Sequence, residues 1–340
     1  MRMGFYHMFS DSISLATRAG GRAAVTPFRR AAAPCCIRIA AVVSVLGVVL
    51  PARAEKPGLP LADRVAWQIA LDRVGYSPGI IDGKIGAKTR LATREAQRVL
   101  GLPQTGELDA GARAKLNVDS AAAFAPYIIS AADVGSVGPT ADDWEAKSKL
   151  PRLAYESLEV ALAERFHCSV GLLRVLNPGA DLNAYQAGDR ISAPHLNPDQ
   201  QKATASKLVV DLSEKTIRAL DVQNRLVGLF HCSIAAKVEK RPRGTATVKV
   251  ITRDPTYTFD PAMWPEVKNV KRKLLIPAGP RNPVGKCWIG LSLPGYGMHG
   301  TPKPELIGKT GSHGCIRLTN WDAVRLGAMV RVGTPVEFVE

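Results

Sequence analysis

One cysteine and two histidines lie close together near the C-terminal end of this chain of 340 residues. Cys315 follows His313 by two residues and His299 by sixteen. A thiolate is a strong nucleophile near neutral pH, and a neighbouring imidazole can accept the thiol proton and later return it. Gly314, directly before the cysteine, allows close approach and can leave an amide free to stabilise an oxyanion. These residue types at this spacing predict acyl transfer by a cysteine.

The residues around the cysteine also include a fixed positive charge. Side chains alternate between faces along an extended backbone, so His313, Cys315 and Arg317 are expected to share one face. The paired donors of an arginine suit a carboxylate, which indicates an acidic substrate. Arg317 could instead hold the active-site loop through carbonyl groups or through Asp322, and both roles are open.

Zinc chemistry is the alternative that these residue types permit. His299, His313 and Cys315 could bind Zn²⁺ with a water molecule in the fourth position. The chain has no HxxH, HxxE or CxxC motif, however, and its cysteine spacing shows no paired disulfide framework. We therefore expect a free thiol at Cys315, no structural disulfide, no metal and no organic cofactor.

The C-terminal part of the chain resembles the catalytic domain of the L,D-transpeptidases, the YkuD-type enzymes of bacterial cell-wall synthesis. The resemblance covers about 205–340 and implies a mostly-β domain. It is carried by residues 276–285, 288–292, 295–301, 308–318, 320–322 and 333–336. One departure is Arg241-Pro242-Arg243-Gly244, where the family often has Thr-Pro-x-Gly before a strand, and this departure affects a turn more than the chemistry.

The resemblance implies a role for each residue of the two motifs. Cys315 would be the nucleophile, His299 would take and return its proton, and His313 would support the site. Candidates for contacts with the substrate or the oxyanion are Ser312, Gly314, Arg317, Gly300 and Thr301.

The activity that the resemblance implies is that of a peptidoglycan L,D-transpeptidase, a transferase of cell-wall biogenesis that affects cell shape. Cys315 would attack the third residue of a tetrapeptide stem and release D-alanine. The thioester would then pass to an amine of a second stem or of an envelope protein attached to the wall. Water as the acceptor would make the protein an L,D-carboxypeptidase, and an inactive catalytic domain would leave a wall-binding protein.

The N-terminus, 1–54, is predicted to be an export signal. It carries seven arginines and one acidic residue, then the apolar run 39–50, then Ala52-Arg53-Ala54, a small-x-small cleavage sequence. The run is short for a membrane span, so we expect cleavage after Ala54 and a location in the periplasm or cell wall, with an uncleaved anchor as the alternative. Without 1–54 the chain keeps 38 basic and 29 acidic residues, and the resulting net charge of +9 suits an anionic envelope polymer. No interleaved aromatic and basic residues indicate binding to nucleic acid.

Residues 60–118 are predicted to form a compact module of three helices. Apolar residues recur at helical spacing in two stretches, and Asp109 is placed to cap a third, shorter helix. The turn 79–86, followed by Thr89 and by 97–101, resembles the three-helix peptidoglycan-binding domain. A helical spacer without affinity for a ligand is the alternative.

Residues 119–149 are predicted to be a linker, and residues 150–196 a second small module. In this module Ser157 and Ser169 are each placed to cap a helix, and a turn at 188–192 leads into a short strand. The pattern resembles a LysM glycan-binding module, although the glycine–aspartate turn usual before the first helix is missing. Glycan binding and a purely structural role are both open.

From residue 207 onward the apolar residues alternate as they do in strands. One helix is expected, at 320–330. Strands are expected at 207–212, 216–221, 226–232, 244–252 and 336–339. The chain is therefore predicted to be an α+β multidomain protein, in which a mostly-β YkuD-like catalytic domain follows the peptidoglycan-binding-like and LysM-like modules.

Overall fold

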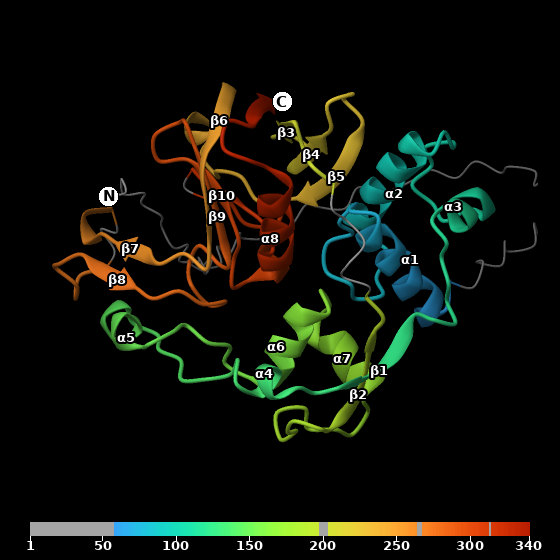
Figure 1. Ribbon diagram of the computed structural model, residues 1–340, viewed down its shortest axis with the longest axis horizontal. Helices are drawn as coiled ribbons and strands as arrows, with labels where there is room; N and C mark the ends of the chain where they lie inside the picture. The colour runs from blue at the N-terminus through green and yellow to red at the C-terminus, as the bar shows by residue number, and fades with distance from the viewer. Residues whose placement is uncertain (1–57, 197–202, 264–266, 313) are drawn as a thin grey trace, which may run out of the picture. The chain divides into compact units, whose positions relative to one another are not determined.

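The computed structural model describes residues 58–196, 203–263, 267–312 and 314–340 (Figure 1). The expected export signal, 1–54, lies outside these residues, and so does His313. Residues 59–340 belong to one compact unit. Within the described ranges, no helix is long and apolar enough to cross a membrane. The cysteines there are free thiols.

Three helices form the N-terminal module, as the sequence predicts. They are α1 (Leu61–Arg73), α2 (Ala87–Val99) and α3 (Ala110–Lys115). The indole of Trp67, buried in α1, donates a hydrogen bond of 2.9 Å to Thr93 of α2 and so joins the two longer helices. Asp109 caps α3 by accepting from the backbone of Ala112, which confirms the predicted helix start.

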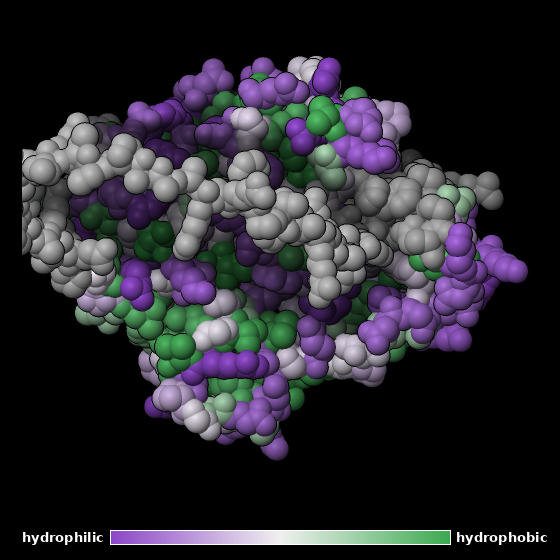
Figure 2. Space-filling model, turned by 180° about the vertical axis from the view of Figure 1, so that it is seen from behind, coloured by the Kyte–Doolittle hydropathy of each residue, from purple (hydrophilic) through white to green (hydrophobic). Residues whose placement is uncertain are grey.

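Two strands and two helices form the middle module. They are β1 (Phe124–Ile128), α6 (Leu158–Arg165), α7 (Val170–Leu176) and β2 (Arg190–Pro194). Ser157 and Ser169 cap α6 and α7 by accepting from backbone amides, as predicted. In the view from behind, hydrophobic residues gather in the lower part of the surface, with hydrophilic residues around them (Figure 2). Exposed Ile128, Val134 and Val175 show that the surface of this module is partly apolar.

Regular structure fills much of 119–149, where a linker is expected. Strand β1 lies there, together with the short helices α4 (Ala131–Val134) and α5 (Trp144–Lys149). Because β1 pairs antiparallel with β2, the middle module begins near Phe124. Helices α4 and α5 follow β1 in the chain, and α5 packs against β8 (Leu274–Ile276). Local periodicity does not reveal the pairing of β1 with β2, since the two strands are far apart in the chain and β1 contains Pro126.

The C-terminal region, from residue 203 onward, is built on an eight-stranded sheet in the order β11-β10-β9-β6-β12-β3-β4-β5. Its strands are β3 (Lys207–Asp211), β4 (Thr216–Leu220), β5 (Leu226–His231), β6 (Gly244–Arg253), β9 (Cys287–Leu291), β10 (Gly297–His299), β11 (Ile316–Arg317) and β12 (Pro335–Val339). Helix α8 (Asn320–Met329) lies against β9 and β10 (Figure 1). Single 3₁₀ turns are η1 (Val238–Lys240), η2 (Pro261–Met263) and η3 (Pro304–Leu306). The strands and the helix expected from residue 207 onward are thus confirmed.

The main core lies between the inner face of this sheet and α8. Alternate residues of β3 and β4 are buried, so these strands present one apolar face to the core. Ala323 and Leu326 of α8 are fully buried in the same cluster. Met298 of β10 and Ile316 of β11 also belong to this core, which thereby fixes the edge strand β11 and its neighbour β10.

A separate hairpin is held by the short helix α5. Strands β7 (Tyr257–Phe259) and β8 (Leu274–Ile276) pair antiparallel. Trp144 of α5 stacks on Phe259 with ring centroids 4.3 Å apart, and the ammonium of Lys147 lies over the same indole. The backbone of Leu153 donates to Ala278 at 2.9 Å. The segment after α4 therefore packs on the hairpin from outside the C-terminal region.

Ionic contacts join the N-terminal module to α8. Arg325 reaches Asp72 at 3.1 Å, and the Asp72 carboxylate also lies 3.2 Å from His167. Ser77 donates to Asp322 at 2.9 Å. Burial alone would raise the pKa of Asp72, but the charges of Arg325 and His167 hold it well below its usual range. Burial raises the pKa of Asp322 to about 6, and Asp72 adds to this shift while Arg325 opposes it.

Asp322→Asn is expected to stabilise the protein above pH 6. A carboxyl whose pKa is raised on folding contributes stability below its unfolded value, near 3.8, and loses it as pH rises through about 6. The asparagine variant should therefore gain on the order of 2–3 kcal/mol over the parent between pH 4 and pH 8. Urea unfolding of the parent and the variant at pH 4 and at pH 8 measures this difference in the free energy of unfolding. Asp72→Asn is the opposite control, because it should destabilise throughout this range, and parallel pH profiles for parent and Asp322→Asn would contradict the expectation.

Candidate active site

Cys315 and His299 are brought together by two strands at one edge of the eight-stranded sheet. β10 pairs in parallel with β11, and the register sets Met298 opposite Ile316 and His299 opposite Arg317. Met298 and Ile316 belong to the main core. Because side chains alternate along a strand, His299, Arg317 and Cys315 lie toward the other face of the sheet.

A second hydrophobic cluster covers the thiol. It joins Cys315 to side chains of the β7–β8 hairpin, to Leu153 and to Trp288. Cys315 is 2% exposed, and His299 is fully buried. Cys315 is therefore buried in the same apolar cluster as the hairpin and Leu153, with little contact with water.

Burial keeps the thiol protonated in this closed arrangement. It raises the pKa of Cys315 to about 11, although a backbone hydrogen bond with Gly297 and the charge of Arg317 oppose the rise. The Sγ atom lies 3.5 Å from the carbonyl oxygen of Gly295, close enough for a weak S–H hydrogen bond. The cysteine is thus a neutral thiol at pH 7 until its surroundings change.

His299 is held neutral and in one tautomer. Burial, together with the charge of Arg317, lowers its pKa to about 3. Its Nδ1 lies 2.6 Å from the carbonyl oxygen of Gly300, so Nδ1 carries the proton and donates it. Nε2 is then an acceptor, and it is buried without a hydrogen-bond partner among the described residues. The indole of Trp288 stacks on the ring, with centroids 5.7 Å apart, and fixes its plane. The imidazole is therefore arranged as a base.

The loop before the cysteine is organised by Ser312. Its hydroxyl donates to the carbonyl oxygen of Cys315 at 2.5 Å and accepts from the backbone amide of Gly314 at 3.3 Å. The backbone of Ser312 in turn donates to Ile234 at 2.7 Å. These bonds hold the turn that carries the thiol.

Gly300 and Thr301 follow His299 directly and form hydrogen bonds within the protein. The carbonyl of Gly300 fixes the His299 tautomer, and its amide donates to Cys287 at 3.1 Å. A side chain at position 300 would collide with the amide oxygen of Asn320, so only glycine fits there. Thr301 is buried, and its hydroxyl accepts from the amide of Lys303. Both residues thus have contacts within the protein, and those of Gly300 orient the imidazole of His299.

Arg317 is half-buried beside the thiol and the imidazole, and its charge lowers the pKa of each. Its backbone is tied to Ser233 by two hydrogen bonds of 2.9 Å. This placement puts a permanent cation next to the thiol and the imidazole.

Two parts of the chain match known protein families. Residues 205–338 match the YkuD L,D-transpeptidase catalytic domain, and residues 61–116 match a peptidoglycan-binding domain. A relative from Bacillus licheniformis named L,D-transpeptidase YkuD is 30% identical over 182 residues, which are 53% of this chain and 92% of the relative. The YkuD protein of Bacillus subtilis (strain 168) is 30% identical over 52% of this chain and 90% of its own length.

The chain belongs to the L,D-transpeptidases. A third relative, named L,D-transpeptidase ErfK/SrfK, from Escherichia coli (strain K12), is 32% identical over 48% of this chain and 53% of the relative. The resemblance seen in the sequence is confirmed for the catalytic domain and for the peptidoglycan-binding domain. It follows that the protein is a transferase of cell-wall peptidoglycan.

The structure of this L,D-transpeptidase adds residues that the motifs did not single out. Trp288 orients the imidazole, and Asn320 fixes the approach of α8 to Gly300. Both belong to strings that carry the family resemblance, which was the available signal for them. The third predicted member of the site, His313, lies outside the described residues. Among the described residues, no group of three His, Cys, Asp or Glu side chains is arranged to hold a metal ion.

Proposed function

We propose that this L,D-transpeptidase uses Cys315 as its nucleophile and His299 as its proton acceptor. The observation that carries the proposal is the hydrogen bond from His299 Nδ1 to Gly300, because it leaves the Nε2 lone pair available. The strand register supports it, since both side chains lie toward the same face of the sheet. His313 is proposed to support this pair.

In the proposed reaction Cys315 attacks the carbonyl carbon of the third residue of a tetrapeptide stem. The thiol proton passes to Nε2 of His299, the carbon–sulfur bond forms, and the imidazole returns the proton to the amine of D-alanine as the amide bond breaks. The resulting thioester is attacked by an amine of a second stem or of a wall-attached envelope protein. Water in the place of that amine would give L,D-carboxypeptidase activity. No cofactor takes part.

Movement of the cover is proposed to activate the pair. In the closed arrangement the pKa values of about 11 for Cys315 and about 3 for His299 make proton transfer between them strongly unfavourable. Burial is the main cause of both shifts. When the β7–β8 hairpin moves aside for a polar substrate, the two pKa values approach each other and the thiolate becomes accessible.

The N-terminal part of the protein is proposed to hold the polymer. The match of 61–116 to a peptidoglycan-binding domain supports a role for α1 to α3 in wall binding. The middle module, whose antiparallel strands enclose two capped helices, is proposed to be LysM-like and to contact glycan strands. An export signal cleaved after Ala54 would place the protein in the periplasm or cell wall.

A product analysis tests this function. Purified protein incubated with disaccharide-tetrapeptide should release D-alanine and carry an acyl adduct on Cys315, both visible by mass spectrometry. Adding an acceptor stem should convert the adduct into a cross-linked dimer. Absence of both the adduct and D-alanine would refute the proposal.

Arg317→Lys is expected to lose acylation by the donor while keeping its melting temperature. Lysine retains the positive charge but cannot form the paired hydrogen bonds with a stem carboxylate that arginine forms. A small thiol reagent should still label Cys315 at a nearly normal rate, because that reaction needs no carboxylate anchor. If the variant instead melts much earlier and loses labelling in parallel, Arg317 holds the loop and is not a substrate anchor.

A further inference from the structure

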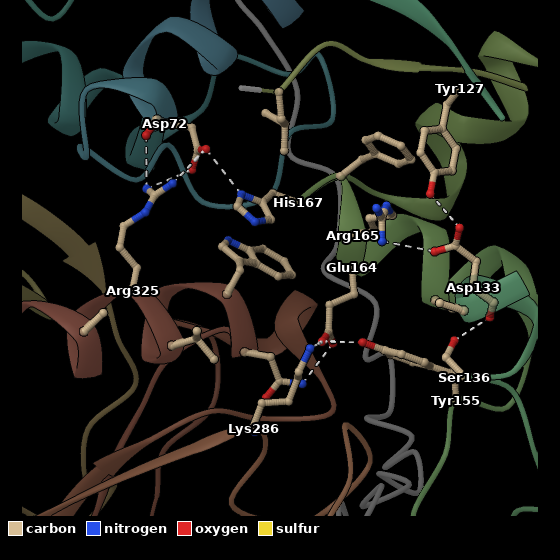
Figure 3. A pocket seen from close by; sticks show the side chains of 18 of the residues that line it. Asp72, Tyr127, Asp133, Ser136, Tyr155, Glu164, Arg165, His167, Lys286 and Arg325 are labelled. Atoms are coloured by element: carbon tan, nitrogen blue, oxygen red, sulfur yellow. Dashed lines mark hydrogen bonds and ion pairs between the residues drawn. The ribbon is translucent and has the colours of Figure 1, made fainter. Parts of the chain in front are cut away.

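A cavity of about 810 Å³ lies away from the thiol, where all three regions of the chain meet. Its walls come from the end of α1, from β1 and α4, from α6, and from α8 together with Lys286 (Figure 3). Neither Cys315 nor His299 lines it. This space is therefore distinct from the proposed catalytic site, and it is large enough for a sugar or a short peptide.

The charge of the lining favours an anion. Five basic side chains line the cavity against three acidic ones: Arg73, Arg152, Arg165, Lys286 and Arg325 against Asp72, Asp133 and Glu164. The acidic groups are already engaged, for Asp72 pairs with Arg325 and Asp133 with Arg165. Glu164 accepts from Tyr155 at 2.6 Å. A carboxylate entering the cavity would therefore meet excess positive charge.

Two of the cations can contact a ligand without breaking a close ion pair. Arg152 is exposed, and no carboxylate among the described residues pairs with it. Lys286 approaches Glu164 only to 3.9 Å, on the side where Tyr155 also reaches that carboxylate (Figure 3). Because neither group is held in a close ion pair, the guanidinium of Arg152 and the ammonium of Lys286 are both suited to bind a carboxylate.

An aromatic wall supplies the other half of the site. The ring of His167 stacks on the indole of Trp321 at 5.2 Å, and both residues line the cavity. Trp321 is 8% exposed, and its indole nitrogen is buried without a hydrogen-bond partner among the described residues. An unsatisfied buried donor is costly, so an acceptor that reached it after a small shift of the ring would stabilise the site. Tyr127 and Tyr155 add further aromatic groups with hydroxyls.

We propose that this cavity binds a carboxylate-bearing fragment of peptidoglycan as a second site for the wall polymer. The inference rests on the proposed function, because that function makes a polymer of sugars and acidic peptides the substrate. Aromatic rings suit the faces of sugars and the apolar parts of peptides, while Arg152 and Lys286 suit the carboxylate. The carboxylate can come from the lactyl group of the sugar or from the stem peptide.

Calorimetry with Cys315→Ala protein tests the site without turnover. The probes are disaccharide-tetrapeptide, the peptide-free disaccharide with its lactyl carboxylate, and the free tetrapeptide. Arg152→Ala should weaken binding of at least one probe about 10-fold or more, and the effect should shrink at high salt. Which of the two smaller probes is affected identifies the source of the carboxylate. Trp321→Phe, which keeps an aromatic ring but removes the N–H, should also weaken binding.

Arg190→Ala is the matched control, since Arg190 is an exposed arginine of the same module that does not line the cavity. It should bind every probe as the parent does. If Arg152→Ala also binds like the parent, the proposal is overturned. A second result would also overturn it. If Arg152→Ala in protein with Cys315 intact loses D-alanine release from the free tetrapeptide to the same extent as it loses binding, Arg152 contributes to the thiol site.

The proposed function can fail separately. A parent protein that binds the probes but releases no D-alanine would refute the proposed function and leave the cavity site standing.

Discussion

Replacing Cys315 with alanine is expected to abolish D-alanine release and thioester formation, with a loss of at least about 10⁴-fold. No other described thiol lies in the cluster under the β7–β8 hairpin. The substitution removes one buried sulfur, so we expect stability to fall by only about 1 kcal/mol. Mass spectrometry of the protein after incubation with disaccharide-tetrapeptide, together with urea unfolding, measures both effects.

The remaining cysteines of the described ranges are matched controls. Cys168, Cys232 and Cys287 are buried thiols, and burial raises the pKa of each. None of them lies with the hairpin that covers Cys315. Their alanine variants should therefore form the acyl adduct at nearly the parent rate. Full turnover by Cys315→Ala, or the loss of turnover in a stable control variant, would sink the proposed mechanism.

The sequence predicted the parts of the fold that follow local patterns. The long strands β3 to β6, strand β12 and helix α8 alternate or repeat over five or more residues, so their periods are readable. Strands β10 and β11, with three residues and two, are too short to show a period. They exist because neighbouring strands and the core hold them, which only the assembled sheet reveals.

The residues of the proposed chemistry could be chosen from the sequence, but their surroundings could not. A cysteine that closely follows two histidines indicates nucleophilic catalysis by residue type alone. The apolar cluster around Cys315 brings together side chains that are far apart in the chain, such as Leu153, Phe259 and Trp288. No local pattern predicts that these side chains will meet. Gly300 is a further case, because its need for a hydrogen side chain comes from Asn320, twenty residues further on. Contacts between distant segments set the pKa values of the site, so those values could not be read from the motif.

The same reasoning applies to the contact between the N-terminal module and α8. Asp72 and Arg325 are 253 positions apart, and each alone resembles an ordinary charged residue of a helix surface. Their pairing buries a carboxylate and a guanidinium together, and it places Asp322 in an environment that raises its pKa. Removing only one partner of such a buried pair is strongly destabilising, because the other charge is left without a counter-ion.

His299→Gln is expected to lower the rate of Cys315 acylation by about 10²–10⁴-fold, the usual cost of losing a positioned base. Glutamine nearly fills the space of the imidazole beside Trp288 but cannot accept the thiol proton. We therefore expect the melting temperature to stay near that of the parent while the acylation rate, followed by mass spectrometry under single-turnover conditions, collapses.

His231→Gln is the matched control for His299→Gln. His231 is also a buried histidine whose pKa burial lowers to about 3, and its Nε2 contacts the carbonyl oxygen of Lys88, away from the thiol. Its replacement should cost stability without slowing acylation. If both variants slow acylation in proportion to their loss of stability, the effect of His299 is structural. If His299→Gln acylates normally while His313→Gln does not, the proton acceptor is His313, because the thiol proton must pass to one of these two imidazoles.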